Sequence, residues 1–550
     1  MKKLLLFTFT LCILSLNAQD YSRIDSLLSK WDEGSTPGFS IGVMKGAELI
    51  YAKGFGLANL DYDIPNTPET VFRIASTSKQ FTAACIILLE KQGLLNLNDT
   101  LTKFFPQFPA YANKITINHL LHHTSGMRDY LVLSYLAGMR DSDYYTDKEV
   151  MDWLVNQQSL NFAPGSEFNY SNSGYWLLGQ IVEKVSGKTL AEYAQENLFG
   201  PLEMKNTHFH DNPNIIVKNR ATGYTSQGEE NFKISETTLP MVGDGGVFTT
   251  VSDFSKWVAE FYVQTEFGKD FWNKMLTVGK LNNGASTDYA CGLMIDEYKG
   301  LQMISHGGAF VGFRSSFHLF PKEKYAVMVF ANRNDISPGS IANDLLMLLL
   351  KDKVKVQEKK VSRENEKTSE IDLAIQELVQ FTGEYELQTG VDFEISIQND
   401  SLNILQKWNN ASYKVTPINE NSFVIPEATD ILFEFSEIKN GKSQLVTVTQ
   451  AGSATPCKRK SSEDPFEVSL SEYVGSYYSP ELLVNYDFLI ENDTLKCKIK
   501  NSQAVALNPS SNDTFVMNGG VVFKFKRENE TVTAFTIDAG RVKGIEFKKE

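Results

Sequence analysis

One serine motif that could support nucleophilic catalysis occurs twice in the chain. Ser76-Thr77-Ser78-Lys79 and Ser436-Glu437-Ile438-Lys439 both have the S-x-x-K spacing. Residues three apart lie on the same face of a helix, where a desolvated lysine can take the proton of a serine hydroxyl. Because the spacing is present in both places, it does not by itself identify a site.

The residues that surround each copy separate the two. Residues 77–92 carry an apolar stripe that ends at Gly93, which predicts a helix with Ser76 in its first turn. The positive end of such a helix would favour the oxyanion formed when the serine attacks. Ser436 lies in an alternating β pattern where nothing else supports catalysis. The structural alternative for Ser76 is a capping serine followed by a solvated lysine.

Gly38-Phe39-Ser40-Ile41-Gly42 matches a different nucleophile motif, G-x-S-x-G. That motif requires a strand, a sharp turn and then a helix. Here a Lys45-Gly46 turn and the strand-like residues 49–52 follow, which predict a hairpin. We therefore interpret Ser40 as an ordinary strand residue.

Two further motifs follow Ser76 along the chain. Tyr170-Ser171-Asn172 has the pattern Y-x-N and precedes a helix expected to begin near Gly174, although Tyr111-Ala112-Asn113 has the same pattern. His306-Gly307-Gly308 follows the strand-like residues 301–305 and precedes the strand-like residues 313–320. Its glycines would let the backbone lie close to a ligand.

The ordered set of S-x-x-K, Y-x-N and H-x-G resembles the class C β-lactamase and D-Ala-D-Ala carboxypeptidase superfamily of serine hydrolases, which is related to penicillin-binding proteins. The resemblance covers residues from about 35 to 350, and its supporting landmarks are residues 72–75, 119–126 and 245–250. It implies an α/β domain with an antiparallel sheet from strands near 38–57 and 290–332. A helix at the N-terminus and an apolar helix around 340–351 would flank this sheet, and a mostly helical subdomain, roughly 77–205, would close the other side of the site.

The resemblance also implies a role for each motif residue. Ser76 would be acylated, and Lys79 and Tyr170 would share the proton transfers, with either of them as the general base. Asn172 would hold the substrate amide or orient Lys79. The oxyanion hole would be formed by the backbone N–H groups of Ser76 and Ala309. The substrate-binding residues are thus expected to be Asn172, His306, Gly308 and Ala309.

His306 departs from the β-lactamases of the superfamily, which carry lysine in a K-T-G motif at this point. An unperturbed histidine has a pKa near ~6.5 and is mostly neutral at pH 7.5, so a permanent anchor for the β-lactam carboxylate is missing. Arg314 could supply that charge, but a structural ion pair is the favoured interpretation of Arg314. We predict a serine hydrolase of D-amino-acid peptides or esters, of the carboxypeptidase, D-aminopeptidase or esterase type. The alternatives are a true β-lactamase and a non-catalytic penicillin-binding or sensor protein of the cell envelope.

The predicted chemistry requires no cofactor. His119, His122 and His123 have a spacing that resembles metal ligands, but no acidic or cysteine ligand set accompanies them, so no metal site is expected. The chain carries a net charge of −14, which would repel nucleic acid on average. The expected partner is a small peptide, ester or cell-wall-derived substrate.

The chain of 550 residues divides into several segments. Residues 1–18 predict a secretory signal, because Lys2 and Lys3 precede a short apolar run and Ala18 suits signal-peptidase cleavage; the protein would be periplasmic or secreted, and not membrane-spanning once the signal is removed. The hydrolase domain is expected over 20–354 and a polar linker over 355–370. Two all-β modules, 371–460 and 465–550, complete the chain.

The two β modules are predicted to be copies of one another. The landmarks Leu378-x-x-Phe381-x-Gly383-x-Tyr385 recur as Leu470-x-x-Tyr473-x-Gly475-x-Tyr477, and Asn-Asp turns follow in the same order. Alternating apolar and polar residues predict antiparallel strands that close into barrel-like modules, which resemble the lipocalin-like domains appended to secreted serine hydrolases. The cysteines are expected to be buried thiols, with a Cys457–Cys497 bridge left open.

Overall fold

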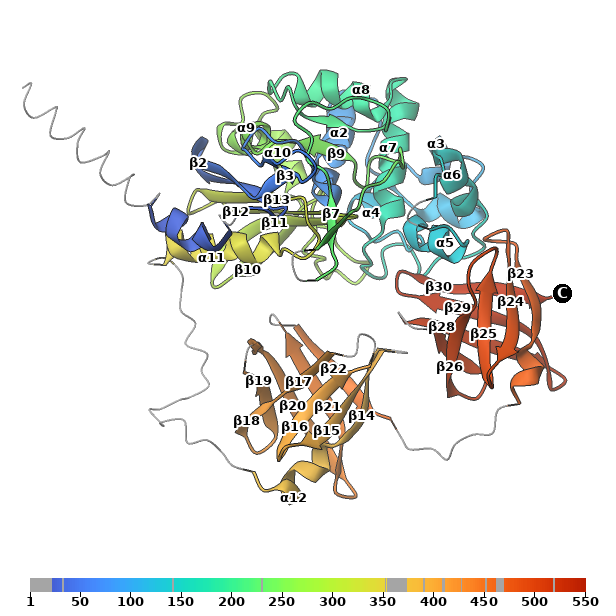
Figure 1. The fold of residues 1–550 in the computed structure, drawn as a ribbon. Coiled ribbons are helices and arrows are strands. Elements are labelled where there is room, and N and C mark those ends of the chain that lie inside the picture. Colours follow the sequence, from blue (N-terminus) through green and yellow to red (C-terminus); the bar gives the residue numbers. More distant parts are fainter. Residues whose placement is uncertain are drawn as a thin grey trace, which may run out of the picture. The chain divides into compact units, whose positions relative to one another are not determined.

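The computed structural model describes residues 22–31, 34–140, 143–228, 231–351, 353, 373–388, 391–407, 411–426, 428–450, 453–460, 469–517 and 520–550. The predicted signal segment 1–18 and linker 355–370 lie outside these residues. The chain forms two compact units that divide near residue 357 (Figure 1). The first unit holds the Ser76 motif and the second holds both repeats. The finer domain limits given above stay predictions.

A six-stranded antiparallel sheet forms the centre of the first unit, with the strand order β10-β11-β12-β13-β1-β2. Its strands are β1 (Phe39–Lys45), β2 (Glu48–Phe55), β10 (Met294–Tyr298), β11 (Leu301–Phe310), β12 (Phe313–Phe320) and β13 (Tyr325–Ala331). The register Phe39↔Ala331 pairs β1 with β13 and joins the N-terminal hairpin to the late strands. The predicted sheet from two distant parts of the chain is therefore confirmed.

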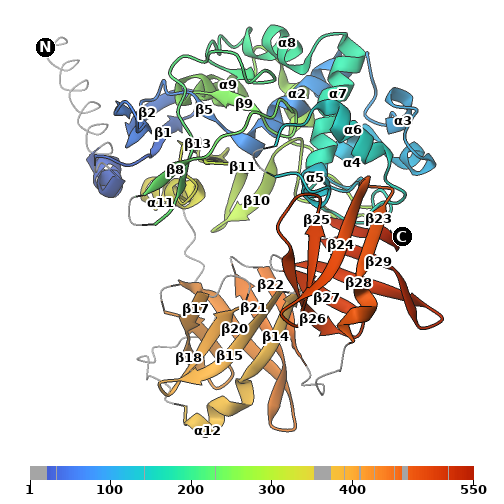
Figure 2. The same cartoon turned by 45° about the vertical axis from the view of Figure 1, so that its right-hand side comes forward.

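Helices cover both faces of this sheet (Figure 2). α11 (Pro338–Leu350) packs on β12 and β13, and α9 (Val251–Val263) packs on β1, β2 and β13. β1 is buried at every position except its last residue, because its side chains alternate between two covered faces. Residues 22–28 form a helical segment whose Ile24 and Leu28 join Ile341 and Leu345 of α11 in one core.

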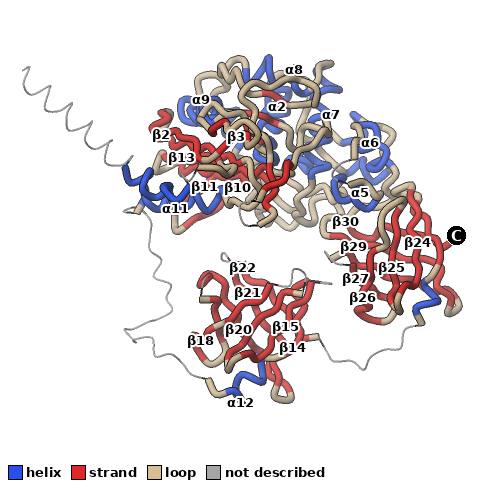
Figure 3. Tube along the Cα trace, in the orientation of Figure 1, coloured by secondary structure: helices blue, strands red, loops and turns tan. Residues whose placement is uncertain are grey.

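The second part of this unit is mostly helical, as predicted for residues 77–205 (Figure 3). Its elements are η2 (Ala75–Ser78), α2 (Lys79–Lys91), α3 (Leu101–Phe104), η3 (Ala110–Lys114), α4 (Ile117–Leu121), α5 (Tyr130–Leu136), α6 (Asp147–Val155), α7 (Asn172–Ser186), α8 (Leu190–Ala194) and η4 (Gln195–Phe199). The apolar helix α2 lies at the centre, because α7, α8 and the later α10 (Lys269–Met275) all pack on it.

A small three-stranded sheet connects the two parts, with the order β5 (Phe72–Arg73), β9 (Val247–Thr249) and β6 (His208–Phe209). Two pairs, β3 (Leu57–Asn59) with β4 (Ile64–Pro65) and β7 (Tyr224–Ser226) with β8 (Phe232–Ile234), complete the unit. Among the helices of the described ranges, none combines the length and the apolar character that a membrane crossing requires.

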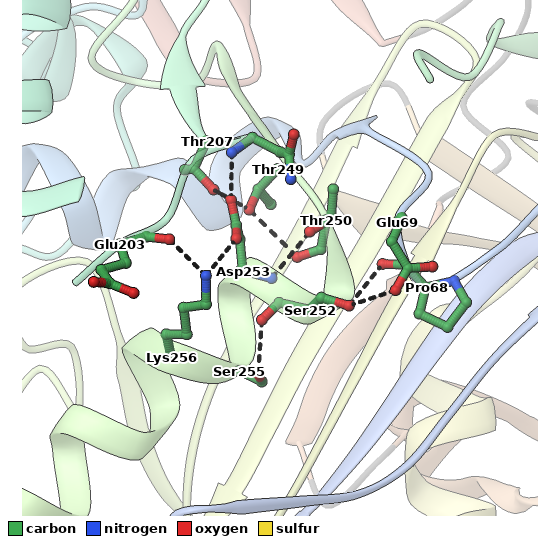
Figure 4. Close-up of polar contacts among 11 residues, drawn as sticks. Pro68, Glu69, Glu203, Thr207, Thr249, Thr250, Ser252, Asp253, Ser255 and Lys256 are labelled. Carbon is green, nitrogen blue, oxygen red and sulfur yellow. Dashed lines mark hydrogen bonds and ion pairs between the residues drawn. The ribbon is translucent and has the colours of Figure 1, made fainter. Parts of the chain in front are cut away.

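A buried carboxylate holds the junction between β9 and α9 in place (Figure 4). The Thr250 hydroxyl caps α9 by accepting the backbone N–H of Asp253 at 2.9 Å. The Asp253 carboxylate in turn accepts the Thr207 hydroxyl at 3.1 Å and pairs with Lys256 at 3.0 Å. These contacts fix the end of β9, which runs beside the residues that precede Ser76.

The second unit contains the two predicted β modules. The first is a nine-stranded sheet with the order β17-β16-β15-β14-β22-β21-β20-β19-β18, and the second is a closed barrel of β23 to β30. The strands of the first are β14 (Gly383–Gln388), β15 (Val391–Gln398), β16 (Ser401–Gln406), β17 (Ala411–Lys414), β18 (Thr416–Asn419), β19 (Ser422–Ile425), β20 (Ala428–Lys439), β21 (Lys442–Gln450) and β22 (Ser453–Arg459). Those of the second are β23 (Gly475–Ser479), β24 (Val484–Glu491), β25 (Thr494–Ile499), β26 (Val505–Ser511), β27 (Thr514–Met517), β28 (Val521–Glu528), β29 (Thr531–Ala539) and β30 (Val542–Lys549).

The repeat is visible in equivalent positions of the two modules. Only Val415 separates β17 from β18, the two end strands of the first sheet, so that sheet returns on itself. In the second module the single strand β26 occupies this place, pairing with β25 at its start and with β27 from Leu507 onward. The hydroxyls of Tyr385 and Tyr477 each donate to the carbonyl four residues earlier, at 3.0 Å in both copies. The two barrel-like all-β modules predicted from the repeat are thus confirmed.

The cysteines of the described residues are buried thiols. Cys85, Cys291, Cys457 and Cys497 are all free, which agrees with the buried-thiol prediction and leaves no Cys457–Cys497 bridge.

Candidate active site

Ser76 lies in a short 3-10 turn, η2, that runs directly into α2. The predicted helix start was therefore wrong by two residues, because the regular α-helix begins at Lys79. Ala75 has a left-handed backbone with φ = +47°, so the chain bends sharply between β5 and the helix. Ser76 is half-buried at this bend, with its hydroxyl beside Lys79.

Lys79 is completely buried, and its amine has three partners. Nζ lies 3.2 Å from Ser76 Oγ, 2.9 Å from Asn172 Oδ1 and 2.6 Å from the carbonyl oxygen of Asp244. The amide oxygen and the carbonyl can only accept hydrogen bonds, whereas the serine hydroxyl can also donate. The Ser76 hydroxyl is therefore the one of these three partners that could pass a proton to Lys79 Nζ.

Asp129 fixes the orientation of the Asn172 amide. Its Oδ2 accepts both the backbone N–H of Asn172 at 2.8 Å and the side-chain Nδ2 at 3.0 Å, so Oδ1 must face Lys79. Asp129 is fully buried, and its other oxygen accepts the backbone N–H of Leu131 at 3.1 Å. The sequence reasoning missed Asp129, although it lies three residues after the landmark segment 119–126.

Tyr170 packs between Lys79 and His306. The centroid of its ring lies 4.8 Å from Lys79 Nζ and 6.3 Å from the His306 ring. The His123 ring packs on it at 4.2 Å, and His123 Nδ1 accepts the backbone N–H of Ser171 at 3.1 Å. The Y-x-N segment therefore approaches Lys79 from two positions, with the Tyr170 ring and the Asn172 amide.

His306 is buried and held by two hydrogen bonds. Its Nδ1 lies 2.6 Å from the carbonyl of Gly307, which can only accept, so Nδ1 carries the proton and Nε2 accepts the Tyr289 hydroxyl at 3.0 Å. Burial, assisted by the charge of Lys79, lowers the His306 pKa to about 3. The prediction of a neutral histidine is confirmed; its partner Tyr289 has no motif around it that could have identified it.

Gly308 brings strand β11 against the turn that carries Ser76. A Cβ atom at Gly308 would lie 2.3 Å from the carbonyl oxygen of Ile74 and 3.1 Å from the backbone nitrogen of Ser76, so only glycine fits. Ala309, which is exposed, follows directly. The expectation that the H-x-G motif separates two strands was wrong, because β11 continues through it to Phe310.

The other residues that the sequence analysis considered, including the second copy of the Y-x-N motif, lie elsewhere in the fold. Ser40 is buried on β1, where its hydroxyl donates to the Thr67 carbonyl at 2.7 Å, which confirms its assignment as a strand residue. Asn113 of the second Y-x-N is in η3 and accepts the Thr102 hydroxyl at 2.6 Å. Arg314 has a structural role: its Nη1 donates to the carbonyls of Val311 and Phe313, and burial lowers its pKa while the nearby charge of Asp335 raises it.

The three histidines with metal-like spacing have separate partners. His119 Nδ1 accepts the backbone N–H of Thr116, and the ring nitrogens of His122 contact the carbonyls of Asn118 and Thr277. His123 packs on Tyr170, as described above. Across the described ranges, no group of three or more histidine, cysteine, aspartate or glutamate side chains could hold a metal ion.

Comparison with known proteins adds to this geometry. Penicillin-binding protein 4* of Bacillus subtilis (strain 168) is 28% identical over 410 residues, which cover 71% of this chain and 88% of that protein. The D-aminopeptidase of Brucella anthropi is 27% identical over 279 residues, or 50% of this chain. The chain spans about half the length of that relative, 52%.

Solved structures share the fold. The octameric penicillin-binding protein homologue from Pyrococcus abyssi has a TM-score of 0.57 at 23% identity, covering 88% of this chain and 98% of that one. The penicillin-binding protein from Bacillus halodurans has a TM-score of 0.52 at 26% identity, covering 59% and 98%.

The family model described as Beta-lactamase matches residues 24–351, which contain every residue placed around Ser76 above. This match spans more than half of the chain. The chain therefore belongs to the beta-lactamase family of serine hydrolases.

Proposed function

We propose that the protein forms an acyl-enzyme on Ser76 and hydrolyses peptides or esters of D-amino acids. The observation that carries this proposal is the set of partners around Lys79, because two of its three partners can only accept and the third is the Ser76 hydroxyl. The relatives named D-aminopeptidase support the choice of substrate class.

The reaction would proceed in two steps on these residues. Ser76 Oγ attacks the substrate carbonyl while its proton passes to Lys79 Nζ, and the oxyanion is bound by the backbone N–H groups of Ser76 and Ala309. The proton then returns to the leaving amine or alcohol through Lys79 or Tyr170, and the C–N or C–O bond breaks. In the second step, water loses a proton to the same base and attacks the ester carbonyl; the base returns that proton to Ser76 Oγ as the bond from the acyl carbon to Oγ breaks and the acid product leaves.

The surroundings of His306 disfavour efficient β-lactam hydrolysis. A β-lactam presents a carboxylate, while the His306 imidazole, with a pKa lowered to about 3 by burial, carries no charge at neutral pH. Because His306 gives that carboxylate no charge at the position where the β-lactamases of the superfamily carry lysine, we propose peptidase or esterase activity ahead of β-lactamase activity. Slow turnover of nitrocefin relative to a D-amino-acid ester would support this order, and rapid nitrocefin hydrolysis would reverse it.

An active-site label tests the acyl-enzyme directly. A fluorophosphonate probe should attach to the wild-type chain at Ser76, located by mass spectrometry, and p-nitrophenyl esters should be hydrolysed. Both signals should vanish in Ser76→Ala. Labelling that survives in Ser76→Ala would place the nucleophile elsewhere, and a wild-type protein that neither labels nor hydrolyses esters would favour the non-catalytic sensor.

We also propose that the protein is exported, on the basis of residues 1–18. Expression of the full chain in a Gram-negative host should yield a periplasmic or secreted form whose N-terminus, determined by mass spectrometry, begins near Gln19. Retention of Met1 in a cytoplasmic form would contradict export without affecting the catalytic proposal.

A further inference from the structure

Arg73 is a buried cation three residues before Ser76. It lies on β5 with 6% of its surface exposed. Its Cζ is 5.5 Å from the centroid of the Phe248 ring and 5.3 Å from that of Phe310. Two aromatic rings therefore contact the guanidinium. Their faces favour its positive charge, but they do not accept hydrogen bonds from its five N–H donors, which point outward in the guanidinium plane.

Within the part of the chain that the structure describes, no acceptor reaches the Arg73 guanidinium. Its Nε is completely buried and has no hydrogen-bond partner. Burial lowers the Arg73 pKa only to about 10, so the charge persists at neutral pH. Asp244 and Glu236 lie near enough to raise the Arg73 pKa through their charges, but among the described residues neither forms an ion pair or hydrogen bond with it. The planar fork of arginine, which matches a carboxylate with two parallel hydrogen bonds, is therefore left without such a partner.

The neighbouring cation, Arg220, is already paired. It contacts the Phe248 ring at 5.1 Å and makes a 3.0 Å ion pair with Glu236. His210 also packs on Phe248, at 4.4 Å, and its buried Nε2 has no partner among the described residues. Arg73 and His210 thus present unsatisfied polar atoms around one phenylalanine ring.

The backbone of Arg73 lies close to Ser76, and the Phe310 ring that contacts its guanidinium belongs to the strand that faces Ser76. Gly308 faces the backbone nitrogen of Ser76, and Phe310, which covers Arg73, follows two residues later on the same strand. Three residues of chain span at most about 11 Å, which limits the Cα separation of Arg73 and Ser76. His306 lies on the same strand, β11, two residues before Gly308. It is neutral and bonded to the Tyr289 hydroxyl, so it offers no charge to an anion.

We propose that Arg73 binds a carboxylate of the substrate, so that the preferred substrates are acidic peptides whose carboxylate lies near the bond cleaved at Ser76. This inference rests on the proposed acyl-enzyme function. The carboxylate could belong to the leaving residue, as in a peptide with a free C-terminus, or to the acyl part. Both sources present the same ligand chemistry to Arg73.

Three matched D-peptides separate these sources: one with a free C-terminal carboxylate on the leaving residue, one with a carboxylate only in the acyl part, and one in which both are amides. Wild-type kcat/KM should be about 10- to 100-fold higher for one of the acids than for the diamide, which is the range for a hydrogen-bonded charge. Equal kcat/KM for all three would overturn the proposal.

Arg73→Gln should reduce that acid-to-diamide ratio to near one, and Arg73→Lys should give an intermediate ratio, because lysine keeps the charge and loses the bidentate fork. Arg140→Gln is the matched control; Arg140 is an exposed arginine paired with Asp143, and its ratio should equal the wild-type ratio. A ratio unchanged in Arg73→Gln would instead assign Arg73 to balancing the charge of the buried Asp244.

Failure of this inference is distinguishable from failure of the proposed function. If the wild-type protein hydrolyses p-nitrophenyl esters but shows no acid preference, only the carboxylate site is wrong. If it hydrolyses nothing, the acyl-enzyme proposal fails first. Should Arg73→Gln not fold, inhibition of the wild-type ester activity decides: N-acetyl-D-alanine should inhibit about 10-fold more strongly than its amide, and equal inhibition would overturn the proposal.

Discussion

The two S-x-x-K sequences of the chain have entirely different surroundings. Ser76 and Lys79 flank the start of a helix, and Lys79 is completely buried between Ser76, Asn172 and Asp244. Ser436 and Lys439 are both exposed near the end of strand β20. The difference shows that the S-x-x-K spacing supports catalysis only under two conditions. The start of a helix must bring the two side chains together, and other groups must accept hydrogen bonds from the remaining N–H groups of the desolvated amine.

The strongest test of this difference removes each serine in turn. Ser76→Ala should lower kcat/KM for a p-nitrophenyl ester by about 10⁴-fold or more, since loss of the nucleophile removes the whole covalent route. Ser436→Ala should leave the rate unchanged. Steady-state kinetics of the two variants check both statements, and a comparable loss in Ser436→Ala would contradict the assignment of the site.

The lysines should differ almost as much. Lys79→Met keeps the length of the buried side chain but removes the proton acceptor, so kcat should fall by about 10³-fold. Lys439→Met, at the exposed position, is the control and should match the wild-type rate. If Lys79→Met retained more than about a tenth of the rate, another group would have to be the base.

The two Y-x-N sequences extend the comparison. Tyr170→Phe should reduce kcat by about 10²-fold, because the ring and its packing on Lys79 remain while the hydroxyl proton is lost. Tyr111→Phe removes the same atom from η3, away from Lys79, and should have no effect on kcat. Equal rates in the two variants would restrict Tyr170 to a packing role.

Asp129 sharpens the comparison through a residue that does not contact substrate. Asp129→Asn should disturb the Asn172 amide and lower kcat by about 10-fold while KM changes little, because a positioned acceptor of Lys79 is lost. Asp143, a partly buried carboxylate that pairs with Arg140, offers a control, Asp143→Asn, with unchanged kcat. An equal rise in KM would instead indicate a role in substrate binding.

The smallest expected effect concerns acid stability at His306. Burial lowers the His306 pKa from 6.5 to about 3, so between these values the unfolded chain takes up a proton that the native protein does not. This contribution to stability is complete above pH 6.5 and is lost as the pH falls. The His306→Gln variant has no such titrating group. Between about pH 6.5 and 5 its free energy of unfolding, measured by urea denaturation, should therefore decrease by roughly 1 to 2 kcal/mol less than that of the wild type. An unchanged slope would show that His306 titrates normally.

The parts of the site that could be predicted from the sequence depend on local pattern. Ser76, Lys79, Tyr170, Asn172 and His306 belong to short motifs, and the central sheet and the barrel-like modules follow from periodicity and repetition. Asp129 and Tyr289 were missed because each acts through a contact with a residue far along the chain, Asn172 and His306, that only folding creates. The helix start was misplaced because an apolar stripe does not reveal a left-handed alanine.

That alanine has a consequence for how the protein balances stability against activity. A left-handed residue other than glycine costs about 1 to 2 kcal/mol, and Ala75 keeps this conformation while its neighbour Ile74 is held by the hydroxyl of Ser315 at 2.7 Å. The strain is thus stored in the folded protein, where it maintains the bend that places the Ser76 hydroxyl beside Lys79.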